Sequence, residues 1–217
     1  MDYALSRFNM IEGQIKTNRV TDPYVLEAMG EVPREAFVPN AKKGVAYIDD
    51  AIEVAKGRFI LEPMVMARML EVAELQNDDI VLDIGCNTGY STAVLAKVVS
   101  TVVALESDEK LAHQATETLN SLGIDNAVVV TGRLSDGVAK QAPYNVIFFN
   151  GSVSEIPDSI KQQLADGGRL ICMVAGDSIL STVSVYTRRD EFFSKRDVLE
   201  AGVARLPGFE VEKGFSF

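Results

Sequence analysis

The sequence predicts an α/β fold with a mostly parallel, doubly wound sheet, a helical cap at the N-terminus and an antiparallel hairpin at the C-terminus. Three observations lead to this prediction. From residue 79 onward, short apolar runs alternate with segments of helical periodicity, as in consecutive βαβ units. These apolar runs are nearly unbroken, which is typical of strands that are covered on both faces. Before residue 79, apolar residues recur at helical spacing instead.

The first 77 residues are predicted to be mainly helical. Residues 4–15 have apolar side chains at helical spacing. Residues 21–30 begin with Thr-Asp-Pro, which combines a capping residue with a proline in the first turn, and they end at a glycine. Residues 44–62 are less regular, and a helix resumes at Pro63. We expect these helices to pack onto the sheet as a cap.

The remaining elements follow from the alternation after residue 79. The predicted strands are, in order, "DIVLDIG", "STVVALE", "NAVVVTG", "YNVIFFN" and "GRLICMVAG". The predicted helices between them are "YSTAVLAKVV", "DEKLAHQATETLNSLG" and "PDSIKQQLADG". Residues 181–202 are predicted to form the terminal hairpin. Because parallel strands joined by helices share one edge for their carboxyl ends, a ligand is expected at that edge.

The composition excludes several classes of function. The net charge of −10 argues against a general nucleic-acid-binding protein and against binding to an anionic membrane. No apolar stretch approaches the length of a membrane span, and the N-terminal segment lacks the features of a secretory signal. Cys86 and Cys172 are the only cysteines and His113 is the only histidine, which argues against a zinc site. We therefore expect a cytoplasmic protein with reduced thiols and no metal.

The turn after the first predicted strand has the features of a ligand site. In "VLDIGCNTGY", the strand ends at Asp83, and Gly85 and Gly89 enclose three small or polar residues. Glycine lets the backbone approach a ligand closely and adopt positive φ. Asn87 stands where another glycine would suit the turn, and asparagine tolerates the left-handed conformation better than most residues. We therefore predict a positive φ at Asn87.

An acidic residue ends the next predicted strand as well. Glu106 follows Asp83 by 23 residues, and an acid at that place can accept hydrogen bonds from both hydroxyls of a ribose. The alternative is a solvated strand end. No lysine follows the glycine turn in the spacing of a triphosphate-binding loop. The pattern therefore favours a nucleoside cofactor without phosphates, such as S-adenosylmethionine.

The chain resembles the class I S-adenosylmethionine-dependent methyltransferases, whose first motif is similar to "VLDIGCNTGY". Within that class it resembles the protein-L-isoaspartate O-methyltransferases over most of residues 9–175. The segments that carry this resemblance are "VLEAMGEVPREAFVP", "AYIDD", "VALESDEKLAHQA", "APYNVIFFNG" and "QQLADGGRLICMVAG". It implies a Rossmann-like class I methyltransferase fold in one domain, with a helical cap and acceptor-side loop at 1–77 and a cofactor-binding sheet at 78–217.

The resemblance implies S-adenosylmethionine as cofactor and methyl transfer to the free carboxylate of an isoaspartyl residue in a protein or peptide. A carboxylate with a pKa near ~4 is already ionised at neutral pH, so the reaction needs positioning rather than a base. The cofactor-binding positions that the resemblance implies are Asp83, Gly85, Cys86, Asn87, Gly89, Glu106, Gly132 and Arg133.

The chain departs from the family pattern on the acceptor side. The family's Thr-Ile-Ser-x-Pro stretch is replaced by "GRFILEP", which places Phe59 at the threonine and Leu61 at the serine. A hydrogen bond to a charged group is worth roughly 1.5–3 kcal/mol, so loss of the serine implies a rate lower by about 10- to 150-fold. Arg58 could bind a carboxylate with two hydrogen bonds, and the alternative is a solvated loop residue. Arg58, Leu61 and Asp49 are the acceptor-side candidates.

A second departure affects the adenine end of the expected cofactor site. The family's Gly-Asp-Gly is Gly132-Arg133-Leu134 here, and a guanidinium cannot accept a hydrogen bond from an adenine amino group. Three functions therefore remain open at the level of sequence. The chain is a working isoaspartyl methyltransferase, of full or weakened activity, a methyltransferase for another acceptor such as a different carboxylate, or a non-catalytic protein that binds the cofactor or a partner protein.

Overall fold

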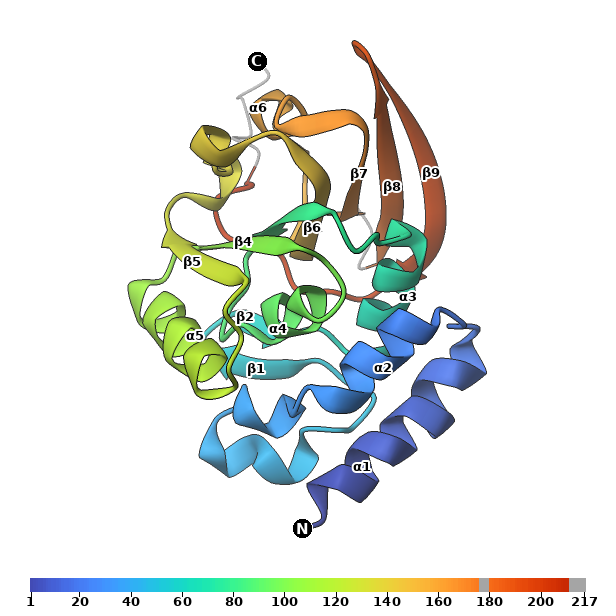
Figure 1. The fold of residues 1–217 in the computed structure, drawn as a ribbon, viewed down its shortest axis with the longest axis vertical. Helices are drawn as coiled ribbons and strands as arrows, with labels where there is room; N and C mark the ends of the chain where they lie inside the picture. The colour runs from blue at the N-terminus through green and yellow to red at the C-terminus, as the bar shows by residue number, and fades with distance from the viewer. Residues whose placement is uncertain (176–179, 211–217) are drawn as a thin grey trace, which may run out of the picture.

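The computed structural model describes residues 1–175 and 180–210, and a seven-stranded sheet lies at its centre (Figure 1). The strand order is β5-β4-β3-β6-β7-β8-β9. The strands of this sheet are β3 (Ile80–Ile84), β4 (Thr101–Glu106), β5 (Ala127–Thr131), β6 (Tyr144–Val153), β7 (Leu164–Ala175), β8 (Ser181–Arg189) and β9 (Phe192–Ala201). Neighbouring strands from β5 to β7 pair in parallel, whereas β8 and β9 form an antiparallel hairpin. The predicted fold class and the terminal hairpin are confirmed.

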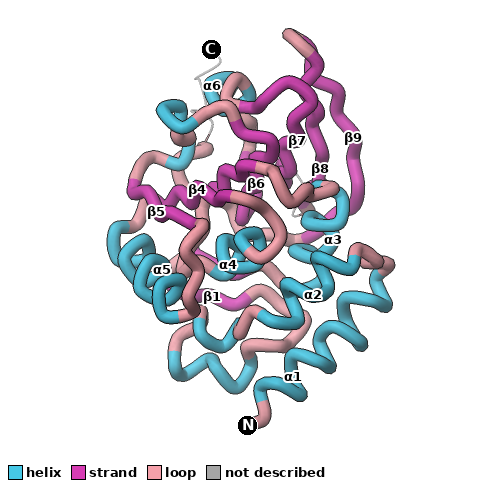
Figure 2. The backbone as a smooth tube through the Cα atoms, in the orientation of Figure 1, coloured by secondary structure: helices cyan, strands magenta, loops and turns pink. Residues whose placement is uncertain are grey.

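Helices surround the sheet and dominate the N-terminal part (Figure 2). The α-helices are α1 (Tyr3–Met10), α2 (Pro23–Glu31), α3 (Pro63–Ala73), α4 (Tyr90–Ala96), α5 (Glu109–Ser121) and α6 (Asp158–Lys161). The predicted start of α2 is confirmed, because the Asp22 side chain accepts hydrogen bonds from the backbone N–H groups of Tyr24 and Val25, and Pro23 occupies the first turn. None of the helices in the described ranges has the length and apolarity that crossing a bilayer requires.

Two features differ from the sequence prediction. The segment "PDSIKQQLADG" was expected to be one helix, but α6 ends at Lys161 and β7 begins at Leu164. Leu164 pairs with Tyr144 before the register shifts, so sheet pairing replaces the last helical turns. Residues 44–62 contain a second, two-stranded sheet of β1 (Ile52–Ala55) and β2 (Arg58–Ile60). Gly176, the last residue of the strand predicted at 168–176, lies outside the described residues.

The apolar side chains form one cluster on each face of the large sheet. One cluster joins the N-terminal helices, α3 and α4 to alternate residues of the strands, such as Val81, Val102 and Val146. The other cluster contains the intervening residues, such as Leu82 and Ile147, together with α6 and the segment after β9. Both faces are therefore covered, which explains the nearly continuous apolar runs. The division into one domain with a cap at 1–77 stays a prediction, which this continuous packing favours.

The β1–β2 hairpin is fixed above the carboxyl ends of the central strands by a buried cation. The Arg34 side chain is fully buried and donates to the carbonyl oxygens of Ala46 (2.7 Å) and Leu61 (2.8 Å). Its guanidinium also lies 4.8 Å from the centre of the Tyr90 ring, within the range of a cation–π contact. Arg34 thus ties the chain before and after the hairpin to α4. This anchorage positions β2 against the glycine turn.

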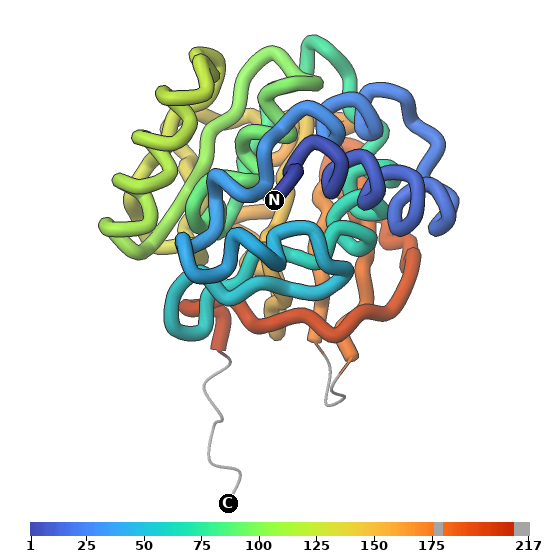
Figure 3. The backbone as a smooth tube through the Cα atoms, turned by 90° about the horizontal axis from the view of Figure 1, so that it is seen from below, coloured from blue at the N-terminus to red at the C-terminus, as the bar shows by residue number. Residues whose placement is uncertain are grey.

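The chain after β9 returns across the same edge of the sheet, and we call residues 202–209 the strap. In Figure 3 the strap passes beside the β1–β2 hairpin. Ser152, near the end of β6, donates its backbone N–H to the carbonyl oxygen of Ala204 (2.9 Å) and accepts from the N–H of Leu206 (2.8 Å). Phe209 packs edge-on against Phe149 with ring centres 5.7 Å apart. The strap is therefore bound to β6 in its middle, by Ala204 and Leu206, and at its last residue, Phe209.

Candidate active site

The glycine turn between β3 and α4 has the backbone conformation that the sequence predicts. Gly85 (φ 75°), Asn87 (φ 55°) and Gly89 (φ 93°) all have positive φ, so the prediction for Asn87 is confirmed. Glycine is required at position 89 for a second reason, since an added β-carbon would lie 3.2 Å from Ala115 Cβ of α5. The turn is further fixed by Thr88, whose hydroxyl donates to the carbonyl oxygen of Phe37 (2.7 Å).

Asp83 is fully buried at the end of β3 and accepts hydrogen bonds from three side chains. Its Oδ2 accepts from the hydroxyls of Ser91 (2.8 Å) and Thr92 (2.7 Å), and its Oδ1 accepts from the Asn150 amide. Burial raises the pKa of Asp83 to about 6, although these three hydrogen bonds favour the charged form. Asp83 therefore links the ends of β3 and β6 to the first turn of α4.

Glu106 ends β4 with its carboxylate fully buried, so the alternative of a solvated strand end is wrong. Three backbone N–H groups donate to it, from Asn87 (2.9 Å), Ser107 (2.7 Å) and Asp108 (2.9 Å). Carboxylates that accept several backbone hydrogen bonds are held in one orientation. The acid that the sequence assigns to a ribose is therefore present, rigid and adjacent to the glycine turn.

Arg58 of β2 binds this carboxylate with both arms of its guanidinium. Its Nη1 donates to Glu106 Oε1 (2.6 Å) and its Nη2 donates to Glu106 Oε2 (2.7 Å). Arg58 is 7% exposed, so the alternative of a solvated loop residue is wrong. The expected chemistry, a guanidinium bound to a carboxylate by two hydrogen bonds, is present. Its partner, however, is the chain's own Glu106.

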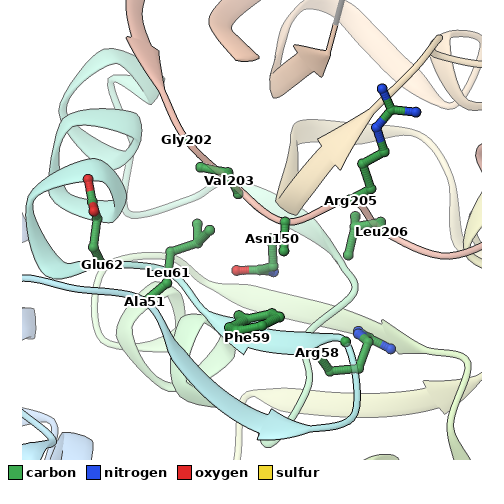
Figure 4. Close-up of a pocket in the computed structure, with 12 residues that line it drawn as sticks. Ala51, Arg58, Phe59, Leu61, Glu62, Asn150, Gly202, Val203, Arg205 and Leu206 are labelled. Atoms are coloured by element: carbon green, nitrogen blue, oxygen red, sulfur yellow. The ribbon is translucent and has the colours of Figure 1, made fainter. Parts of the chain in front are cut away.

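The strap passes Asn150 opposite the β1–β2 hairpin (Figure 4), and its Leu206 covers the other side of the turn. A β-carbon added to Gly85 would lie 2.7 Å from Leu206 Cδ2, and one added to Gly151 would lie 2.7 Å from Leu206 Cγ. Leu206 is 4% exposed and packs in the core cluster with Phe209. The pocket among the hairpin, Asn150 and the strap has a volume of about 10 Å³. This is room for about one water molecule.

The acceptor-side candidates are separated by the structure. Leu61 is 3% exposed and lines the small pocket together with Phe59 and Glu62. Asp49 is exposed and is absent from that lining. Asp49 nevertheless interacts electrostatically with Glu62. The pKa of Glu62 is raised mainly by burial and further by the neighbouring carboxylates of Asp49 and Asp50. The face expected to bind an acceptor is therefore apolar in the pocket and acidic at its rim.

The residues expected at the adenine end lie along a second depression. The Gly132 N–H donates to the carbonyl oxygen of Glu106 (2.9 Å), and Arg133 is exposed. A cavity of about 370 Å³ runs along this side, and its lining comprises Ser107, Arg133, Leu134, Ser135, Pro207 and Gly208. Cys86 is buried within the turn, and burial raises the pKa of its thiol. The strap thus continues past Leu206 into the depression where an adenine is expected.

The arrangement does not fit S-adenosylmethionine in the conformation of the structure. Pockets for ligands of this size have volumes of about 300–1,000 Å³, far above the 10 Å³ between the hairpin and the strap. Larger cavities, of about 510 and 370 Å³, border Arg58 and Arg133. Both carboxylate oxygens of Glu106 are bound by Arg58, and the open face of Gly85 is covered by Leu206. The predicted cofactor residues are brought together, yet Arg58 occupies the ribose position and Leu206 covers the face of Gly85 that a cofactor needs.

Sequence reasoning missed one pairing and two residues of this site. The pairing of Arg58 with Glu106 joins residues 48 positions apart, and no local pattern indicates it. Asn150 lies within β6 and directly follows its apolar run in "FFNG", and a polar residue after such a run was a usable signal for its contact with Asp83. Leu206 lies in a segment without helical or strand periodicity, so nothing in the sequence placed it against Gly85.

The chain is similar to a known protein family. The model of the family "Protein-L-isoaspartate(D-aspartate) O-methyltransferase (PCMT)" matches residues 6–202. Protein-L-isoaspartate O-methyltransferase 1 of Rhodopseudomonas palustris is 38% identical over 186 residues, which are 86% of this chain and 76% of that protein.

Two solved structures have the same fold. One, named protein-L-isoaspartate O-methyltransferase, is 28% identical with a TM-score of 0.83, and the match covers 93% of this chain and 66% of that one. This chain therefore spans about two thirds of that protein. The other, a beta-aspartate methyltransferase from Plasmodium falciparum in complex with S-adenosyl-L-homocysteine, is 20% identical with a TM-score of 0.79. That match covers 92% of this chain and 97% of the other.

Proposed function

Because the chain belongs to the protein-L-isoaspartate(D-aspartate) O-methyltransferase family, we propose that it is an S-adenosylmethionine-dependent O-methyltransferase that acts on isoaspartyl carboxylates of proteins or peptides. One observation carries this proposal beyond family membership. Asp83 and Glu106, both fully buried, end adjacent parallel strands on either side of a turn with three residues at positive φ. Such a constellation at the carboxyl edge of a parallel sheet suits a nucleoside ligand.

The proposed cofactor contacts are those of the glycine turn and the two strand ends, with Glu106 for the ribose and Asp83 for the amino acid end. The filled cleft means that these contacts require a different arrangement of Arg58 and the strap. The acceptor side is proposed to lie at Phe59, Leu61 and the acidic rim. Cys86 and Cys172 are both buried free thiols, which suits our placement of the protein in the cytoplasm.

A methyl-transfer assay tests this proposal directly. The full chain is incubated with S-adenosylmethionine labelled in the methyl group, together with an isoaspartyl peptide or its matched normal aspartyl peptide. We expect label in the isoaspartyl peptide alone, at a rate roughly 10- to 150-fold below that of a family member with the acceptor serine. Glu106→Gln serves as the control variant, because it keeps the shape of the side chain and loses the charge. Equal labelling of both peptides would contradict isoaspartyl specificity.

A second candidate function follows from the apolar acceptor side. Leu61 stands where the family has serine and is 3% exposed, so no hydroxyl is offered to an isoaspartyl carboxylate at this position. We infer that a different carboxylate acceptor is the strongest competing substrate. The same assay with peptides that carry a free C-terminal carboxylate or a glutamate distinguishes the two candidates. Labelling of these peptides in place of the isoaspartyl peptide would support the second candidate.

A further inference from the structure

The expected cofactor cleft is occupied by the chain itself at the ribose position and at the glycine turn, whereas a cavity of about 370 Å³ remains at the adenine end. At the ribose position, the Arg58 guanidinium takes both oxygens of Glu106 at 2.6 and 2.7 Å. At the glycine turn, Leu206 covers Gly85 and Gly151 so closely that neither position has room for a β-carbon. These contacts come from two segments that are far apart in sequence. Their coincidence on one cleft argues for a common role.

The ribose position is filled by a group of matching chemistry. Two ribose hydroxyls would donate two hydrogen bonds to a carboxylate, and the guanidinium donates two hydrogen bonds in the same geometry. Arg58 lies on β2 and Glu106 on β4, and the Asn87 side chain donates to the carbonyl oxygen of Phe59 (3.0 Å) beside them. Hairpin and turn are therefore joined by both an ion pair and a neutral hydrogen bond.

The strap borders the rest of the cleft. Its backbone bonds to Ser152 set Leu206 over the glycine turn, and Pro207 and Gly208 continue beside Ser107 and Arg133 at the adenine end. The side chain of Arg205 points away from the pocket toward the outside (Figure 4). The family match ends at residue 202, which is the residue where the strap begins. The strap therefore lies at the C-terminal limit of the family match and runs along the cleft that the strand ends form.

We propose that Arg58 and the strap form an internal plug that competes with S-adenosylmethionine for the cofactor cleft. This inference rests on the proposed function, since it concerns the regulation of the same site. In the closed state the plug excludes the cofactor, and in the open state Arg58 leaves Glu106 and Leu206 leaves Gly85. The apparent affinity for the cofactor is then the intrinsic affinity reduced by the fraction of open molecules. Changes that weaken the plug raise that fraction and therefore raise the affinity.

Calorimetry with S-adenosylhomocysteine tests the competition. We expect Arg58→Ala and Leu206→Ala each to bind the ligand at least ten-fold more tightly than the wild type. Arg189→Ala and Leu122→Ala are matched controls on the surface, and they should bind as the wild type does. Arg58→Met removes the charge and keeps most of the bulk, so it provides the test if Arg58→Ala does not fold. Affinities in the plug variants equal to that of the wild type, or no binding by any of them, would overturn the proposal.

Hydrogen exchange on the wild-type chain gives a second readout. A ligand that closes over a site slows the exchange of the amides around it, whereas a ligand that displaces the strap must free the Leu206 N–H from Ser152. We therefore expect saturating S-adenosylhomocysteine to speed exchange in peptides that cover 202–209 and to slow it in those that cover the glycine turn. Slower exchange in both would show that the strap stays in place, and it would refute the plug.

The two proposals fail in different ways. If the plug variants bind the ligand tightly but transfer no methyl group to any peptide, the plug proposal is supported and the proposed function is refuted. If the wild type binds the ligand and transfers the methyl group as well as the plug variants do, the plug proposal is refuted and the proposed function is supported. The binding and transfer assays are therefore run on the same variants.

Discussion

The raised pKa of Asp83 predicts how the stability of the folded chain depends on pH. Burial raises the pKa of its carboxyl from an ordinary value of 3.8 to about 6. Each factor of ten in proton affinity is worth about 1.4 kcal/mol, so the charged form costs the folded state about 3 kcal/mol at neutral pH. The folded chain binds this proton more tightly than the unfolded chain does. The stabilising contribution of Asp83 is therefore complete below pH ~4 and is lost as the pH rises through ~6.

The perturbation is Asp83→Asn, which keeps the shape of the side chain and removes the titration. We expect the difference in unfolding free energy between variant and wild type to shift by about 2–3 kcal/mol in favour of the variant between pH 4 and pH 7. The assay is urea unfolding of both proteins at several pH values in this range. Asp125→Asn, at an exposed position, reports the background. Parallel curves for wild type and Asp83→Asn would refute the raised pKa and the argument from burial.

Three further predictions concern the framework of the site. Gly89→Ala should lower the unfolding free energy by at least about 2 kcal/mol, because it adds a clash to a left-handed conformation, whereas Gly57→Ala in open space should lose only about 1 kcal/mol. Equal losses in thermal unfolding would contradict the clash. Arg34→Met should cost about 3 kcal/mol in urea unfolding, since two buried carbonyls lose their donor. A loss below about 1 kcal/mol would show that water replaces it. Phe59→Thr combined with Leu61→Ser should raise isoaspartyl methylation at least ten-fold in the labelled-peptide assay, and unchanged activity would favour another acceptor.

Features set by local backbone chemistry were predictable from the sequence. The positive φ at Asn87 follows from a five-residue turn between a strand and a helix, and the cap of α2 follows from Asp22 and Pro23. Both depend on residues within a few positions of one another. The helix predicted over residues 157–167 was wrong after Lys161 because pairing with β6 took over its last turns. Tertiary pairing overrides local propensity in such segments.

The positions of Arg58 and Leu206 in the cleft were not predictable either, because they depend on tertiary contacts. Residue types alone show that Arg58 can bind a carboxylate, but the choice of Glu106 depends on how β2 lies over β4. That placement is fixed by Arg34 and by contacts of the hairpin with the glycine turn, which join positions far apart in the chain. The position of Leu206 likewise depends on two backbone bonds to Ser152. Pairings of this kind have no period or spacing in the sequence.

The balance between open and closed states depends on the same carboxylate. Removing one partner from a buried ion pair costs about 3–5 kcal/mol, so Arg58 cannot leave Glu106 without compensation. Two hydroxyl donors to a carboxylate return about 1.5–3 kcal/mol each, which offsets most of that cost. The exchange of guanidinium for ribose is therefore nearly neutral at Glu106. What remains is the strap, where exposing Leu206 alone costs about 1.5–3 kcal/mol. The Arg58–Glu106 ion pair thus contributes little to the free-energy difference between the closed and open states. The apolar contacts of the strap set the fraction of molecules that are open.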